Sequence, residues 1–128
     1  MTEQDIIAAG ANKAPRITPA DIEAAIAGEH YFTAAEGVIQ SEAGATQAEL
    51  VPLELNLLTF CVLILKNGHR IVGVNEGPVS AANFDAALGR KLARQKAVDQ
   101  IWPLLGYELR SKLADDALFV AAVARCES

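Results

Sequence analysis

The chain has 128 residues, of which 52% are hydrophobic and 5% aromatic, and its formal net charge is −5. That length suffices for one domain with an aliphatic core that needs neither a disulfide nor a metal. The longest apolar run, residues 57–65, is far shorter than the roughly 20 residues of a membrane-spanning helix. The first residues include Glu3 and Asp5, whereas a signal peptide begins with positive charge. We therefore expect a cytoplasmic protein with no membrane partner.

The charges divide unevenly along the chain. Residues 1–56 hold nine acidic and two basic residues, whereas residues 57–128 hold seven acidic and nine basic residues. The two parts can attract each other within the chain or between subunits. Because the whole chain is acidic and poor in aromatic residues, its composition disfavours nucleic acid as a partner.

The amino-terminal residues 1–16 lack apolar periodicity and are predicted to form a flexible tail, which leaves a single domain over residues 17–125. A helix is predicted to start at the cap residue Thr18, because Pro19 suits the first helical position and Asp21 suits the positive end of the helix dipole.

This helix pattern fades around Gly28, and the aromatic segment 29–32 is expected to anchor the chain onto the core. Residues 33–49 are rich in Ala, Gly, Ser, Thr and Glu. That composition predicts a loose or weakly helical connection.

The strongest local pattern is a β-hairpin. Two apolar segments, residues 57–66 and 69–74, flank Asn67-Gly68. An Asn-Gly pair tolerates the positive φ angles of a two-residue type I′ turn, so we predict two antiparallel strands joined by that turn.

The first strand of this hairpin is apolar on both faces, so helices or a second subunit must cover both sides. A lone hairpin is marginal in water, and we expect further pairing with residues 50–55 or with a partner chain. The prediction is therefore a homodimer, or another homo-oligomer, formed through the apolar strand.

A long basic helix is predicted from the cap residues 80–83 to about Ile101, where Pro103 must kink or end it. A short helix over residues 104–114 and a third helix from Asp115 follow. The face of the long helix expected to lie against the sheet consists of Phe84, Leu88, Leu92, Val98 and Trp102. The predicted fold class is α+β, with a small antiparallel β-hairpin sheet packed against three to four helices, one of them long and basic.

The residues that could support catalysis do not form a recognisable set. Cys61 lies in the most apolar run, so we expect it to be a small buried residue and not a nucleophile paired with a histidine. Cys126 is expected to be an exposed free thiol. The adjacent Asp115 and Asp116 point in different directions along a helix, and neither metal-ligand spacing nor a glycine fingerprint is present. We therefore expect no enzymatic activity and no cofactor.

A basic cluster is the strongest binding candidate. Arginine offers a planar fork that matches phosphate or carboxylate, and an aromatic ring beside it suits a flat ligand. The candidate anion-binding residues are Arg90, Lys91, Arg94, Tyr107 and Arg110. The alternative is that these basic residues form a solvated surface whose charge is balanced by the acidic amino-terminal half. In that case Trp102 and Tyr107 lie on the apolar face and anchor the core.

Three segments resemble one protein family in the same order along the chain: RITPADIEAAIAGEHYF (residues 16–32), LLTFCVLILKNG (57–68) and ANFDAALGRKLARQKAVDQIWPLLGYELRSKLA (82–114). They are similar to the small phage and prophage proteins named after gene product forty-nine and gene sixty-six of two enterobacterial phages. The resemblance implies a phage or prophage origin and a bacterial cytoplasm. It brings no catalytic residues with it, because the family has no established activity.

Three functional hypotheses remain open. The leading hypothesis is a non-enzymatic phage accessory protein that binds a host or phage macromolecule. The second is a small-molecule binder that sequesters a phosphorylated nucleotide signal of host defence. The third is a minor virion or assembly protein.

Overall fold

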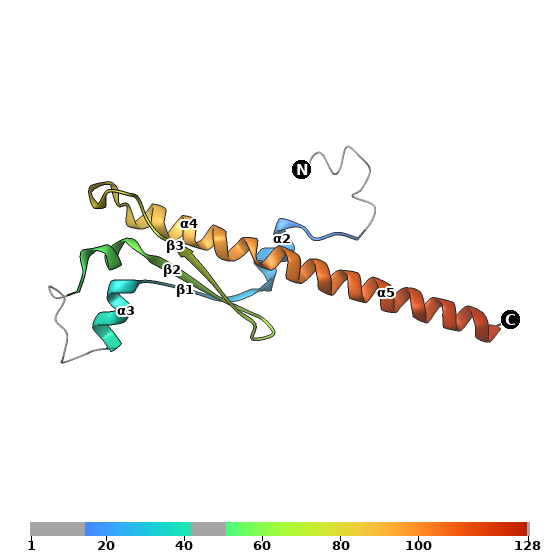
Figure 1. Cartoon of the computed structure of the whole chain (residues 1–128). Coiled ribbons are helices and arrows are strands. Elements are labelled where there is room, and N and C mark those ends of the chain that lie inside the picture. Colours follow the sequence, from blue (N-terminus) through green and yellow to red (C-terminus); the bar gives the residue numbers. More distant parts are fainter. Residues whose placement is uncertain (1–14, 42–50, 128) are drawn as a thin grey trace, which may run out of the picture. The chain divides into compact units, whose positions relative to one another are not determined.

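The computed structural model describes residues 15–41 and 51–127 (Figure 1). The chain divides into two units: one is formed by residues 24–100, and the other combines the residues up to 23 with those from 101 onwards. The predicted tail lies outside the described residues except for its last two positions, and the single domain over residues 17–125 stays a prediction.

The larger unit is built on a three-stranded antiparallel sheet with β2 in the centre. Its strands are β1 (Ile26–Thr33), β2 (Thr59–Leu65) and β3 (Arg70–Asn75). Leu63 of β2 pairs with Glu29 on one side and with Ile71 on the other. The α+β class predicted from the sequence is therefore confirmed.

The third strand is not the expected one. Residues 26–33 pair with β2, whereas Leu53–Leu57 form the 3₁₀ turn η3. The preceding Pro52 has no N–H with which to join a ladder, which disfavours a strand there. The expected pairing of residues 50–55 is therefore wrong for the described residues 51–55, and the segment 29–32 is a strand instead of an isolated anchor.

The hairpin of β2 and β3 is confirmed, but its turn differs from the predicted type I′. Gly68 has a φ of 89°, and within the described residues every residue with a positive φ is a glycine. Asn67 therefore has a negative φ, whereas a type I′ turn needs positive φ at both of its central residues. The Leu65 carbonyl accepts from the Gly68 N–H, and the Leu65 N–H donates to the His69 carbonyl. This pattern corresponds to a three-residue loop with glycine in the left-handed position.

Helix α4 (Ala86–Asp99) packs against β2 and β3 through its smallest residues. Its buried positions are Gly89, Ala93 and Ala97. A Cβ atom on Gly73 of β3 would overlap the Ala93 carbonyl and lie 2.5 Å from the Ala97 nitrogen, so helix and strand backbones are in direct contact.

The predicted sheet-facing side of this helix, with Phe84, Leu88, Leu92, Val98 and Trp102, is consequently wrong. Leu88 is 51% exposed. Large side chains cannot fit where glycine and alanine let the two backbones approach, so the small-residue side of the helix faces the sheet.

Helices α2 (Pro19–Ala25) and α3 (Ala34–Ser41) both begin with a reciprocal capping box. The Asp21 N–H donates to Thr18 Oγ1 and the Thr18 N–H donates to Asp21 Oδ2, which confirms Thr18 as a cap residue. Thr33 and Glu36 repeat this exchange before α3. Residues 34–41 of the predicted loose connection are therefore helical, and its residues 42–49 lie outside the described ranges.

The carboxyl-terminal helices start and end at other residues than expected. Residues 81–83 form the 3₁₀ turn η4 (Ala81–Asn83), and Asp85 is the N-cap of α4. Helix α5 runs from Ile101 to Glu127 without a break, so the predicted division at Asp115 is wrong. Pro103 is accommodated because it stands in the first turn of α5, where the N–H groups have no helical partner.

Candidate functional site

The face of the sheet opposite α4 carries apolar side chains from all three strands. Successive residues of a strand point to opposite faces, and Cys61 and Leu63 are buried on the α4 side. The other face is called the open face below; its residues are His30, Phe32, Phe60, Val62, Ile64, Val72, Val74 and, at the start of β3, the charged Arg70.

Two aromatic rings organise one end of the open face. Phe32 and Phe60 are paired across β1 and β2, and their rings stack with centroids 5.0 Å apart and an angle of 2° between the planes. Helix α3 lies beside them, because the Cβ position of Gly37 is 3.8 Å from the ring of Phe32.

Residues from each of the three strands are accessible on the open face. Phe32 is 38% exposed, Ile64 37% and Val72 47%. Large apolar side chains that share one face of a rigid sheet are typical of an interaction surface. The arrangement can bind an apolar surface of another molecule.

On the opposite face, Glu29 links β1 to α4. The Arg94 Nε donates to Glu29 Oε1 at 2.8 Å, and the Tyr31 hydroxyl donates to Glu29 Oε2 at 2.7 Å. The hydrogen bond from Tyr31, followed by that from Arg94, lowers the pKa of the Glu29 carboxyl. Burial, together with Glu29, raises the pKa of Tyr31.

The five candidate anion-binding residues are distributed over both units. Arg90, Lys91 and Arg94 lie on α4, where Arg90 and Lys91 are exposed and Arg94 already binds a carboxylate. Tyr107 and Arg110 lie on α5, in the other unit. Three of the five residues therefore share a helix, and the complete anion site stays a prediction.

The aromatic residues of α5 are more exposed than a core position allows. Tyr107 is 77% exposed and Trp102 38%. The expectation that Tyr107 anchors the core is therefore wrong.

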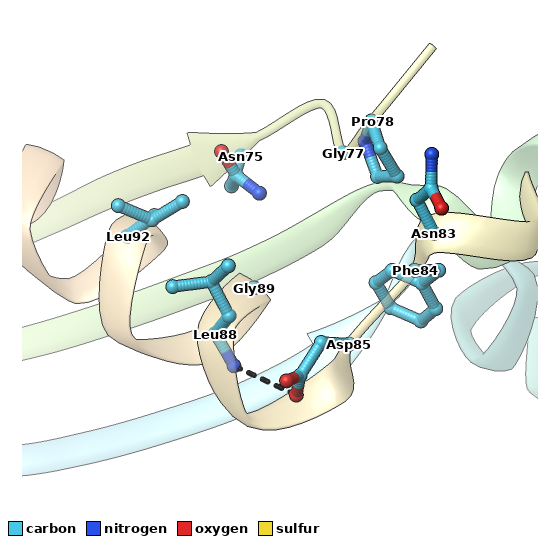
Figure 2. Close-up of a pocket in the computed structure, with 9 residues that line it drawn as sticks. All are labelled: Asn75, Gly77, Pro78, Asn83, Phe84, Asp85, Leu88, Gly89 and Leu92. Atoms are coloured by element: carbon cyan, nitrogen blue, oxygen red, sulfur yellow. Dashed lines mark hydrogen bonds between the residues drawn. The ribbon is translucent and has the colours of Figure 1, made fainter. Parts of the chain in front are cut away.

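A pocket of about 210 Å³ lies between the first turns of α4 and the end of β3 (Figure 2). Its lining includes Asn75, Phe84, Leu88 and the cap residue Asp85, whose Oδ1 accepts from the Ala87 and Leu88 N–H groups. A carboxylate at its edge disfavours an anion, and its volume is below the roughly 300 Å³ of small ligand sites. None of the five candidate anion-binding residues lines it.

The two cysteines lie as expected. Cys61 is fully buried and Cys126 is exposed. Burial raises the pKa of the Cys61 thiol, which disfavours the nucleophilic thiolate.

Metal and membrane sites are not found in the parts that the structure describes. Residues 15–41 and 51–127 contain no group of three or more His, Cys, Asp or Glu residues that could hold a metal ion. In the same ranges, every helix is too short or too polar to cross a bilayer.

The contribution of β1 to the open face was not predicted from the sequence, because residues 26–33 were not recognised as a strand. His30 and Phe32 alternate with Glu29 and Tyr31, which is a period of two. That alternation is the signal of a strand with two different faces, and it was outweighed by the helical pattern just before it.

Comparisons with curated proteins and with solved structures give no significant match. A family model does match, and it covers residues 17–113, which is more than half of the chain. The resemblance found in the sequence is thereby confirmed: the chain belongs to the Phage protein (N4 Gp49/phage Sf6 gene 66) family.

Proposed function

We propose that this phage protein is a non-enzymatic binding protein that acts in the bacterial cytoplasm and holds a host or phage protein against its open face. The observation that carries the proposal is the row of exposed apolar side chains on a sheet that α4 supports from behind. A flat apolar surface on a rigid element suits a protein partner better than a small ligand, which needs a concave site.

The environment of the cysteine also favours binding over catalysis. Cys61 is fully buried and the pKa of its thiol is raised, so this residue is a poor nucleophile. On the α4 side of the sheet, the Glu29 carboxylate accepts hydrogen bonds from Tyr31 and Arg94, so its role is structural.

The first test changes the open face without changing the core. Val72→Glu places a charge on the open face, where Val72 is 47% exposed, and Val79→Glu makes the same change in a loop residue that is fully exposed. Both variants are expected to fold, as checked by circular dichroism. Affinity capture from infected cells, quantified by mass spectrometry, should lose one specific protein with Val72→Glu and retain it with Val79→Glu.

The outcomes of this test are distinct. Capture that is identical for the two variants contradicts the proposal. If Val72→Glu instead converts a dimer of the free protein into a monomer, the open face holds a second copy, as the predicted dimer through the apolar strand requires. Light scattering on both variants separates these two occupants.

The alternative function, sequestration of a phosphorylated nucleotide, is supported by the exposed pair Arg90 and Lys91 on α4. A bound nucleotide must raise the melting temperature by mass action. Melting temperatures that do not change across a panel of nucleotides would contradict this alternative.

A further inference from the structure

Helix α5 has an apolar surface that the described residues of its unit leave exposed. The helix has 27 residues and is about 40 Å long. Ile101 is its only buried residue among those whose side chains are described, whereas Leu113 is 40% exposed and Val120 is 65% exposed.

Leaving aside Leu104, Tyr107, Leu118 and Phe119, which lie at other angles, seven apolar residues of α5 form a stripe along the helix. At 3.6 residues per turn they fall within about 100° of one another around the axis. The residues of this stripe are Trp102, Leu105, Leu109, Leu113, Val120, Val123 and Ala124. Among the residues of α5 up to 126, Asp116 is the one charged residue at the same angles.

The stripe changes in side-chain size along its length. Its first half, up to Leu113, consists of one tryptophan and three leucines, whereas its second half consists of valines and an alanine. Two such helices pack best when the large side chains of one lie beside the small side chains of the other. An antiparallel pair satisfies this condition, and a parallel pair does not.

The charges beside the stripe favour the same orientation. Lys112 lies on the same flank as Asp116, at the midpoint of the helix. In a parallel pair, Asp116 faces its own copy, and like charges repel. In an antiparallel pair, Lys112 faces the partner's Asp116, which also sets Leu105 opposite the partner's Val123.

We infer that α5 is a dimerisation helix, and that its stripe pairs antiparallel with α5 of a second copy of this chain. The inference is independent of the proposed function, and the surface differs from the open face. The family match ends at residue 113, so the small and acidic half of the stripe lies beyond the matched residues.

The size of the surface sets the expected strength of the pair. A strip about 40 Å long and about 10 Å wide offers on the order of 400 Å² from each helix before side chains interdigitate. A standard specific interface buries about 800 Å² per partner. We therefore expect a dimer that dissociates reversibly in the micromolar range.

The first experiment is sedimentation equilibrium of the full chain with two matched variants. Val120→Asp charges the stripe, and Leu118→Asp charges the opposite side of the helix, where the native side chain is 67% exposed, close to the 65% of Val120. The dissociation constant should rise at least about tenfold for Val120→Asp, and Leu118→Asp should match the wild type. A wild-type chain that stays monomeric, or two variants that behave alike, overturns the inference.

The second experiment tests the orientation. Lys112→Glu and Asp116→Lys should each weaken the homodimer, and a mixture of the two variants should form heterodimers preferentially, because each altered side chain then faces its opposite charge. Native mass spectrometry counts the species. An absence of heterodimer preference overturns the antiparallel pair, as does a dimer that is abolished by Val72→Glu on the open face.

Discussion

Gly73 is the residue on which the packing of the larger unit depends most directly. A Cβ atom there would overlap the backbone of α4 at Ala93 and Ala97, and a backbone cannot move aside as a flexible side chain can. We expect Gly73→Ala to lower the free energy of unfolding by about 3 kcal/mol. Urea unfolding followed by circular dichroism measures this change.

Gly37→Ala is the matched control for that substitution. Its new methyl group would meet the ring of Phe32 at 3.8 Å, an ordinary contact, and the position is inside α3. Alanine favours a helix over glycine by about 1 kcal/mol, so this variant should be at least as stable as the wild type. Equal losses for both variants would contradict the direct backbone contact at Gly73.

Glu29 makes the stability of the fold depend on pH. Its pKa is lowered from the ordinary 4.5 by the Tyr31 hydroxyl and then by Arg94. A carboxylate with a lowered folded pKa contributes stability that is complete above its unfolded pKa and is lost as the pH falls through the folded value. Because the side chains of Arg94 and Glu29 remain 30% and 34% exposed, the contribution is screened to about 1 kcal/mol.

Glu29→Gln should therefore be less stable than the wild type at about pH 7 and nearly equal to it at about pH 3. Urea midpoints at the two pH values measure the difference. A difference that persists unchanged at the lower pH would show that the charge of Glu29 is not its source.

At the scale of the elements, Asp85 determines where α4 begins. Its carboxylate accepts from the N–H groups of Ala87 and Leu88, at 2.9 Å and 3.2 Å. Asp85→Ala should cost about 1 kcal/mol of stability, whereas Ser80→Ala should cost almost nothing, because Ser80 makes no side-chain cap hydrogen bond. Thermal unfolding of the two variants checks this, and a larger loss for Ser80→Ala would contradict it.

The elements that the sequence predicted are those with local chemical signals. The Thr18 cap and the Asn67-Gly68 hairpin were readable because each depends on a few adjacent residues. The capping box of Thr33 and Glu36 is an equally local signal. It was not used, because the glycines that follow it favoured the prediction of a loose connection. The small-residue side of α4 was not readable, because the reason for it is Gly73, which lies on another element.

At the scale of the whole molecule, the α+β fold class and the protein family could be predicted from the sequence. The open face of the sheet and the arrangement of the candidate anion-binding residues could not. The two apolar faces of β2 were predicted, but the face that α4 covers depends on the close approach of α4 to Gly73, which lies on β3. The candidate anion site rested on helical spacing alone, which cannot reveal that Arg94 binds Glu29.

Gln100 protects the outer edge of the sheet. The Leu65 N–H bonds to the His69 carbonyl, and because bonded and non-bonded pairs alternate in an antiparallel ladder, the polar groups of Val72 turn away from β2. The Val72 carbonyl accepts from the Gln100 amide at 2.8 Å. A strand from another molecule would have to displace that amide, so the side chain acts as a built-in barrier to fibre-like growth along β3.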